Sequence, residues 1–130
     1  MYEKREKRWG SETVIFYGPY LVKRLVIDGT TSMHYHNGKT ETIIVESGVL
    51  GVEVEDGTHY LNPGETLTLY EQQRHRMFGS ATYIECSTPQ LYDSVRSEQC
   101  PHCQTIVESK TLLFTCSCGI TFKREGNVLR

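Results

Sequence analysis

The stretch Ser32-Met33-His34-Tyr35-His36-Asn37-Gly38-Lys39-Thr40-Glu41 joins a strand-like segment, a turn and three side chains of metal-binding type. His34 and His36 are separated by one residue, so on a β-strand both imidazoles point to the same face of the sheet. Asn37-Gly38 is a turn signal. Glu41 follows this turn, where the next segment can return its carboxylate to the same centre. We therefore expect strands here, with a metal-binding group on one face.

The β pattern continues on both sides of this stretch. Short runs rich in Val, Ile, Leu, Thr and Tyr alternate with turn signals at a spacing of roughly ten residues. Within one run, Leu50, Val52 and Val54 share a strand face while Glu53 points to the other. The turn signals are Gly18-Pro19, Asp28-Gly29, Asn37-Gly38, Ser47-Gly48, Asp56-Gly57, Asn62-Pro63-Gly64 and Gly79-Ser80. With no segment of helical periodicity, the sequence predicts an all-β sandwich or barrel of short antiparallel strands.

A further metal-binding side chain, His75, lies far along the chain, after the Pro63-Gly64 turn and an alternating strand. Three neutral imidazoles and one carboxylate suit a divalent cation such as Zn, Mn, Fe, Ni or Co. Coordination positions left to water would make such a centre catalytic rather than structural. The sequence thus predicts one metal site, whose ligands are His34, His36, Glu41 and His75. We expect His59 to be an ordinary solvent or core residue.

The same residues resemble the cupin superfamily. A first motif reads Gly29-x4-His34-x-His36-x4-Glu41-x6-Gly48, and a second reads Gly57-x5-Pro63-Gly64, followed by His75. The closest likeness is to the cupin domain of mannose-6-phosphate isomerases, including those fused to mannose-1-phosphate guanylyltransferase. The likeness covers about residues 9–96, in the segments 9–12, 20–25, 32–41, 75–76, 84–89 and 93–96. It implies a cupin jelly-roll β-barrel with a bound divalent metal.

The chain departs from the isomerase branch at several positions. His34 stands where that branch commonly has Gln as the first ligand, and Lys39 stands where it often has Arg. Thr42-Ile43 replaces the aromatic residue that usually follows the Glu closely. The first motif is also one residue shorter than the usual cupin pattern, as in the isomerase-like branch. The resemblance therefore implies the fold and the metal more directly than the substrate.

Lys39 is the candidate catalytic residue, because it matches the family's Arg position. It could grip a phosphate or sugar oxygen, or move a proton if its pKa were lowered. The alternative is a solvated loop lysine. Arg76 follows a ligand and should point to the opposite face. For Glu85 there are two interpretations: a group that supports the ligands or acts as an acid or base, and an outward-facing strand residue, which we favour.

Three function classes fit these features. The resemblance implies a mannose-6-phosphate isomerase-like enzyme, a metal-dependent sugar or sugar-phosphate isomerase or epimerase. In such an enzyme the metal polarises a carbonyl while a base moves a proton between neighbouring carbons. An Fe(II)-dependent cupin oxygenase would use the same ligand set. A non-catalytic metal- or sugar-binding module, with a C-terminal segment that docks a partner, is the third.

That C-terminal segment carries a second candidate metal site. Cys100-x2-Cys103-x12-Cys116-x-Cys118 supplies four thiolates from two short loops and resembles a zinc ribbon with a structural Zn. A rubredoxin-like iron site is the alternative. A piece of about 30 residues cannot build an adequate core, so the metal should supply folding energy. We expect residues 105–107 and 112–114 to pair as a hairpin around Ser109-Lys110. His102 should be a bystander, and Cys86, in the barrel, a buried thiol.

The composition gives the domain organisation and limits the partners. We expect a cupin β-barrel over residues 1–96, with residues 1–8 as a charged tail or helical turn, and a zinc ribbon over 97–130 that begins with a polar connector, Ser97-Glu98-Gln99. The ribbon should fold independently, so that Cys100→Ser leaves the barrel's thermal transition largely intact.

A net charge of −2 and nearly balanced charges beyond residue 97 give no electrostatic case for nucleic acid. There is no apolar run of transmembrane length and no secretory signal near Met1, so we expect a cytoplasmic protein with no membrane partner. In a reducing compartment, five cysteines indicate metal ligands or free thiols. A small sugar or sugar phosphate is the expected ligand, and a homodimer and a protein partner for the ribbon are both left open.

Overall fold

The computed structural model describes residues 4–88, 94–111, 113–123 and 128–129. Within these ranges the regular structure is entirely β, which confirms the predicted fold class. The strands are β1 (Lys4–Lys7), β2 (Gly10–Tyr17), β3 (Leu21–Thr30), β4 (Met33–His36), β5 (Glu41–Val54), β6 (Gly57–Leu61), β7 (Thr66–Leu69), β8 (His75–Ser87), β9 (Ser94–Gln99), β10 (Ile106–Ser109), β11 (Leu113–Thr115), β12 (Thr121–Lys123) and β13 (Val128–Leu129). No helix among the described residues is long and apolar enough to cross a membrane.

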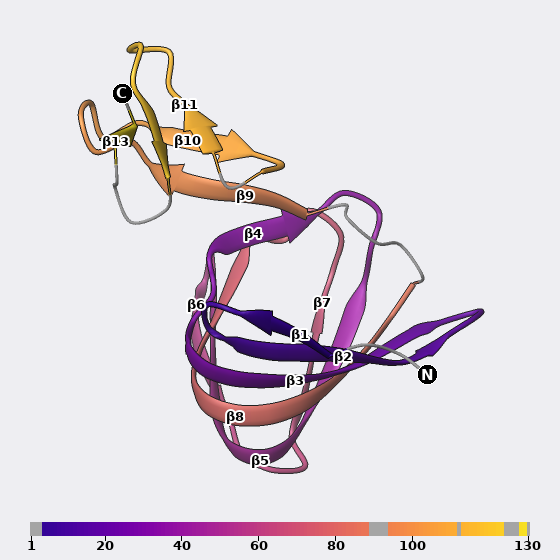
Figure 1. Cartoon of the computed structure of the whole chain (residues 1–130). Coiled ribbons are helices and arrows are strands. Elements are labelled where there is room, and N and C mark those ends of the chain that lie inside the picture. The colour runs from indigo at the N-terminus through magenta and orange to yellow at the C-terminus, as the bar shows by residue number, and fades with distance from the viewer. Residues whose placement is uncertain (1–3, 89–93, 112, 124–127, 130) are drawn as a thin grey trace.

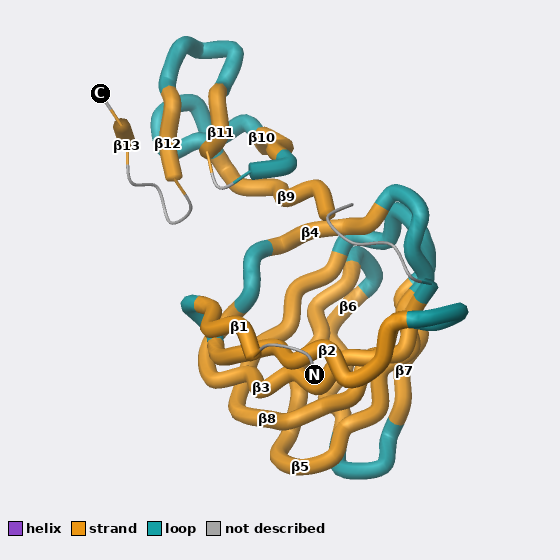
Figure 2. Tube along the Cα trace, turned by 45° about the vertical axis from the view of Figure 1, so that its right-hand side comes forward, coloured by secondary structure: helices purple, strands orange, loops and turns teal. Residues whose placement is uncertain are grey.

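Two long strands, β5 and β8, form the frame of the barrel. They pair antiparallel along nearly their whole length. The other edge of β8 pairs with β3, and the other edge of β5 pairs with β6 and β7. Figures 1 and 2 show these strands curling round a single interior. The sheet has the curled form expected of a jelly roll.

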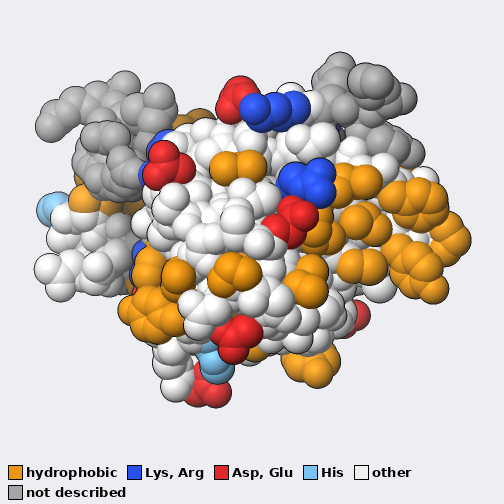
Figure 3. Space-filling view, turned by 90° about the horizontal axis from the view of Figure 1, so that it is seen from below, with side chains coloured by type: hydrophobic (Ala, Val, Ile, Leu, Met, Phe, Trp, Pro, Cys, Tyr) orange, Lys and Arg blue, Asp and Glu red, His pale blue; other side chains and the backbone are white. Residues whose placement is uncertain are grey.

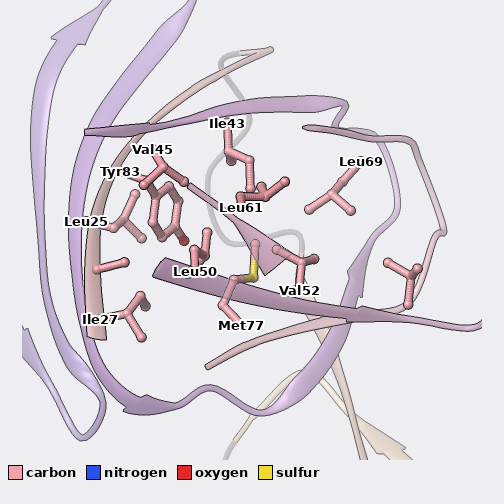
Figure 4. Packing of buried hydrophobic residues seen from close by; sticks show 12 residues of the cluster. Leu25, Ile27, Ile43, Val45, Leu50, Val52, Leu61, Leu69, Met77 and Tyr83 are labelled. Carbon is pink, nitrogen blue, oxygen red and sulfur yellow. The ribbon is translucent and has the colours of Figure 1, made fainter. Parts of the chain in front are cut away.

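The barrel core follows from strand alternation. Leu50, Val52 and Val54 are buried, as predicted, and they pack with residues of β3, β6, β7 and β8 (Figure 4). The cluster consists of Leu25, Ile27, Ile43, Val45, Leu50, Val52, Val54, Leu61, Leu69, Met77, Ala81 and Tyr83. On the outer surface, Glu53 instead pairs with Arg76, 2.7 Å from Oε2 to Nη2. The face seen from below mixes acidic, basic and hydrophobic side chains, with no broad basic area among the described residues (Figure 3).

A bulge in β5 depends on Gly48. The register with β8 shifts between Val45 and Ser47, and Gly48 has a φ of 77°. A Cβ added there would collide with the carbonyl group of Ser80 on the neighbouring strand. Only glycine satisfies both the backbone angle and the close approach.

Gly48→Ala is therefore expected to lower the free energy of unfolding by about 1–3 kcal/mol or more. Gly64→Ala is the matched control, because Gly64 also has a positive φ, of 88°, but nothing lies within 4 Å of its added Cβ. Thermal denaturation of both variants checks this prediction. Equal losses would mean that the collision with β8 contributes nothing.

The expectations for the N-terminal residues and for Cys86 are wrong. A tail or helical turn was expected over residues 1–8. Residues 1–3 lie outside the described residues, and residues 4–7 form β1, which pairs with β2. All four of its side chains are exposed, so backbone hydrogen bonds rather than a buried face hold the strand. Cys86 is exposed rather than buried, because its neighbours on β8 point inward.

The C-terminal residues extend the barrel sheet before they form their own. Strand β9 pairs with β4 on one side and with β10 on the other. Residues 97–99 are therefore strand, not a polar connector, and the sheet crosses the expected boundary at residue 96. Leu112 lies outside the described residues; the described parts of the predicted hairpin, 105–107 and 113–114, do not pair with each other, because β10 pairs with β9 and β11 pairs with β12. We call residues 97–130 the C-terminal module.

A small second core lies within this module. Phe114 and Phe122 stack with ring centroids 5.3 Å apart, and both are fully buried. Cys100 and Cys116 complete the buried cluster. The turn after β9 is closed by Cys100 N–H donating to the carbonyl of Thr105, at 2.8 Å. The first cysteine pair thus forms the β9–β10 turn itself.

Candidate metal centres

The four predicted barrel ligands come from three strand termini that meet at one end of the barrel. His34 and His36 lie on β4, Glu41 opens β5 and His75 opens β8. One donor atom from each lies within 4.8 Å of the others. His34 and His75 are direct cross-strand partners, with ring centroids 4.3 Å apart. The structure therefore brings together all four residues that the sequence pattern selected.

Local backbone carbonyls orient two of the imidazoles. His34 Nδ1 lies 2.8 Å from the carbonyl oxygen of Ser32, and His75 Nδ1 lies 2.9 Å from that of Gln73. In each pair Nδ1–H donates to the carbonyl, which leaves the Nε2 lone pair for the centre. In both cases the carbonyl belongs to the residue two positions before the histidine. It fixes the tautomer that a metal-binding histidine needs.

The donor atoms fit a divalent cation. Glu41 Oε1 lies 3.0 Å from His36 Nε2 and 3.2 Å from His75 Nε2. Two ligands at about 2.1 Å from one ion, at right angles, would be about 3 Å apart. Neither Glu41 Oε1 nor His75 Nε2 has a hydrogen-bond partner of good geometry in the described part of the chain, although both atoms are buried. Such orphaned atoms cost about 1–3 kcal/mol each, and a cation would satisfy both.

The charge state of the group also suits a cation. Burial, together with the neighbouring His75 and His36, holds the pKa of His34 well below its ordinary value. Burial alone would raise the pKa of Glu41, but its polar contacts with Glu85, His36 and His75 outweigh burial and hold it well below the ordinary range. The group therefore offers a neutral imidazole beside a carboxylate at neutral pH.

Lys39 and Glu85 form a buried ion pair next to these ligands. Lys39 is 4% exposed and Glu85 5%, and Lys39 Nζ lies 3.3 Å from Glu85 Oε2. The carboxyl groups of Glu85 and Glu41 also interact: Glu41 raises the pKa of Glu85, and Glu85 lowers that of Glu41. Lys39 is thus not a solvated loop lysine, and the expectation that Glu85 faces outward is wrong. Arg76 does face the opposite side from His75, as predicted.

Simple alternation explains the position of Glu85. It lies ten residues after His75 on the same strand, and an even separation places two side chains on one face. Burial raises the pKa of Glu85 well above its ordinary value, and the Glu41 carboxylate raises it further, while Lys39 and Lys23 oppose the shift. The alternating pattern could therefore have identified this residue from the sequence.

Three more polar residues near the site were not singled out by sequence. Tyr83 is buried, and burial followed by the carboxylates of Glu85, Glu41 and Glu12 raises its pKa well above the ordinary value. Lys23 Nζ lies 3.5 Å from Glu12 Oε2, and Lys23 is the cross-strand partner of Glu85. The signal for these residues is the β3–β8 register, which a single sequence does not reveal.

The four cysteines of the C-terminal module also converge. The sulfur atoms of Cys100 and Cys118 lie 3.7 Å apart, and those of Cys103 and Cys116 lie 3.5 Å apart. None of the five cysteines, all in the described part of the chain, is in a disulfide. Four thiolates at about 2.3 Å from one zinc would be about 3.8 Å apart, so the group fits tetrahedral zinc.

The pKa shifts differ among the four cysteines. A hydrogen bond with the Ile120 backbone lowers the pKa of Cys118, but burial and the other three cysteines raise it to about 12, whereas the pKa of Cys103 is lowered. Hydrogen bonds with the side chain and backbone of Thr105 lower the pKa of Cys103 to about 6. His102 is exposed and does not join the group, as expected. The thiolate that binds a metal is therefore favoured at this cysteine even before an ion arrives.

The fold and the barrel ligands define a small β-barrel protein with a candidate divalent-metal centre at one end. Residues 23–82 match the family described as the cupin domain. Among solved structures, a sugar phosphate isomerase from a cupin superfamily, from Silicibacter pomeroyi, is 15% identical with a TM-score of 0.61, and the alignment covers 99% of this chain and 92% of that one. That alignment therefore extends into the C-terminal module.

Two further structures match the barrel. Pac13, a nucleoside dehydratase from Streptomyces, is 19% identical with a TM-score of 0.63, over 72% of this chain and 82% of that one. KdgF from Halomonas sp. is 16% identical with a TM-score of 0.62, over 70% of this chain and 91% of that one. No protein of curated function matches the sequence. The barrel therefore shares the fold of these structures, and residues 23–82 match the cupin-domain family model.

Proposed function

We propose that the protein is a metal-dependent enzyme that moves a proton between neighbouring carbons of a sugar or sugar phosphate, as an isomerase or epimerase does. The observation that carries this proposal is the Lys39–Glu85 pair, buried against the ligand Glu41. A structural metal site requires only its ligands. A buried ion pair costs desolvation, and such perturbed groups cluster at functional sites.

Each residue of the site has a proposed role. Glu41 and the imidazoles of His34, His36 and His75 would hold the cation, which polarises a substrate carbonyl when bound. Glu85 and Lys39 are the candidate acid–base pair that takes a proton from one carbon and returns it to the next. The burial of Lys39 against Glu85 favours this proton-holding role over a grip on a phosphate.

The structural relatives support the reaction class. One is a sugar phosphate isomerase and another a nucleoside dehydratase. Both kinds of reaction need a group that accepts or donates a proton beside a carbon–oxygen bond. The closer likeness to mannose-6-phosphate isomerases rests on the sequence motifs and is part of the proposal, as is a structural zinc ribbon at the C-terminus.

The test combines metal content, ligand binding and proton exchange. The purified protein should contain a divalent barrel metal, and a panel of sugar phosphates should raise its melting temperature. In D₂O, NMR should show deuterium entering the responding sugar at the carbon beside its carbonyl. Glu85→Gln should slow this exchange by roughly a hundred-fold or more, the scale of general acid–base catalysis. Glu53→Gln, on the outer surface, should leave it unchanged.

Other outcomes would select the rival functions. The three-histidine, one-glutamate set also suits Fe(II), so barrel iron with substrate-dependent O₂ uptake and no deuterium exchange would favour an oxygenase. A melting shift without turnover would favour a binding module. If no sugar or sugar phosphate shifts the melting temperature, the sugar assignment is wrong.

A further inference from the structure

The strand that carries two barrel ligands is supported mainly by the C-terminal segment. Strand β4 has one residue paired with β8, at His34–His75. All four of its residues pair with β9, in the register Met33–Ser97, His34–Arg96, Tyr35–Val95 and His36–Ser94. Figures 1 and 2 show β9 running beside β4 at the end of the barrel from which the C-terminal module extends. The position of His34 and His36 therefore depends on β9.

Strand β9 is in turn held by the cysteine site. It pairs with β10 on its other edge and ends at Gln99, next to Cys100. Cys100 is fully buried in the small second core. One continuous sheet thus runs from the histidine ligands on β4 through β9 to the turn that carries Cys100 and Cys103.

Side chains join the same elements. Arg74, which precedes His75, places Nη1 3.2 Å from Ser97 Oγ and Nη2 2.8 Å from Glu108 Oε2. Its guanidinium group lies 5.6 Å from the ring centroid of Tyr35, the residue between the two β4 ligands. Burial and then the carboxylate of Glu108 on β10 raise the pKa of Tyr35, so Glu108 acts on Tyr35 as well as on Arg74. We call the ion pair, with these contacts, the Arg74–Glu108 bridge.

We propose that the Arg74–Glu108 bridge positions the barrel histidines from the C-terminal module, so that the metal affinity of the barrel depends on the state of the four-cysteine site. Arg74 and Glu108 are positioning residues, since they act through His75 and through Tyr35 on β4. This inference concerns metal binding and is independent of which reaction the barrel carries out.

The expected size of the effect on metal affinity distinguishes this positioning role from a contribution to folding stability. The Arg74 and Glu108 side chains are 34% and 40% exposed, and an ion pair so exposed contributes little to folding. The orientation of ligands is more sensitive, because outer partners of metal ligands change metal affinity by roughly 10- to 100-fold. The bridge contacts neighbours of the metal ligands and not the ligands themselves. We therefore expect Glu108→Gln to weaken the metal affinity of the barrel by roughly ten-fold, with an almost unchanged melting temperature.

The chain supplies a matched control on the other side of His75. Arg76 follows that ligand and pairs with Glu53 on β5, with Nη2–Oε2 at 2.7 Å and exposures of 37% and 36%. The two ion pairs have nearly the same length and exposure. Only the Arg74 pair reaches the C-terminal module, whereas the Arg76 pair stays within the barrel. Glu53→Gln therefore removes an equivalent charge without touching the bridge.

The test uses the full chain loaded with Co²⁺ at both sites. Thiolate-to-cobalt charge transfer reports the cysteine site, and the visible bands of a cobalt–imidazole centre report the barrel. A competing chelator titrates the barrel ion in wild type, Glu108→Gln and Glu53→Gln. The same titration is made on Arg74→Glu, on Glu108→Arg and on the charge-swapped pair that combines them. We expect Glu108→Gln, but not Glu53→Gln, to lower the affinity of the barrel site for Co²⁺ while the charge-transfer band persists. We expect the swapped pair to bind the barrel ion more tightly than either of its single substitutions.

Removing the cysteine-site ion gives the second arm of the test. Stripping that ion from wild type should also weaken the barrel by roughly ten-fold or more. The proposal is overturned if Glu108→Gln and Glu53→Gln have equal effects, or if stripping the cysteine site leaves barrel affinity unchanged. It is equally overturned if Glu108→Gln loses the charge-transfer band while the barrel binds as before, or if the swapped pair binds no better than its single substitutions.

Discussion

Replacing His36 with alanine is expected to remove the barrel metal. His36 is 7% exposed, and its Nε2 lies 3.0 Å from Glu41 Oε1, so the substitution removes one of the four converging donors. Even partners outside the ligand shell change affinity by up to about 100-fold, so losing a ligand should cost more than that. Elemental analysis and chelator competition would measure the loss.

His59→Ala is the control for this prediction. His59 lies on β6, is exposed and does not belong to the converging group. The control should keep full occupancy of the barrel, and the cysteine site should stay loaded in both variants. A His36→Ala protein that retains its barrel metal at wild-type affinity would show that the four donors do not form one site.

The barrel ligands could be predicted because their geometry is local or periodic. His34 and His36 share a face by strand alternation alone, and the turn at Asn37-Gly38 returns the chain to Glu41. Glu85 follows from the same rule, through its even separation from His75. The expectation that it faces outward is wrong because Lys39 provides a buried partner for its carboxyl group. The burial of Lys39 could not be read locally, since its partner Glu85 lies on another strand.

Strand pairing without a buried face is where sequence reasoning failed. Strand β1 exposes every side chain, so no hydrophobic pattern marks it. Ser97-Glu98-Gln99 reads as a polar linker, yet these residues extend a sheet because β4 and β10 supply partners for both edges. The same pairing separates the two segments that were expected to form the ribbon hairpin. Such pairings depend on backbone hydrogen bonds between distant residues, which composition does not record.

Because one sheet continues from the barrel into the C-terminal module, Cys100→Ser should affect both the module and the barrel strands paired with it. Cys100→Ser removes one of four thiolates from a module whose buried core contains only Phe114 and Phe122 besides two of the cysteines, among the described residues. Structural zinc typically contributes about 10–16 kcal/mol to such a site, far more than this core can replace. We therefore expect β11 and β12 to lose their structure and the zinc to be released.

The barrel should then respond in a graded way. If β10 and the turn that carries Cys100 and Cys103 are lost, β9 keeps only β4 as a neighbour. Both strands should then open more often, while the amides of β3, β5 and β8 stay protected from hydrogen exchange. Hydrogen exchange read by mass spectrometry should show full loss of protection beyond residue 99, partial loss in β4 and β9, and none in β8. The exposed barrel residue Cys86 gives the control, Cys86→Ser, which should match wild type throughout. Unchanged protection in β4 would mean that the barrel stands alone, as the sequence first suggested, and cysteines paired as disulfides would remove the zinc assignment itself.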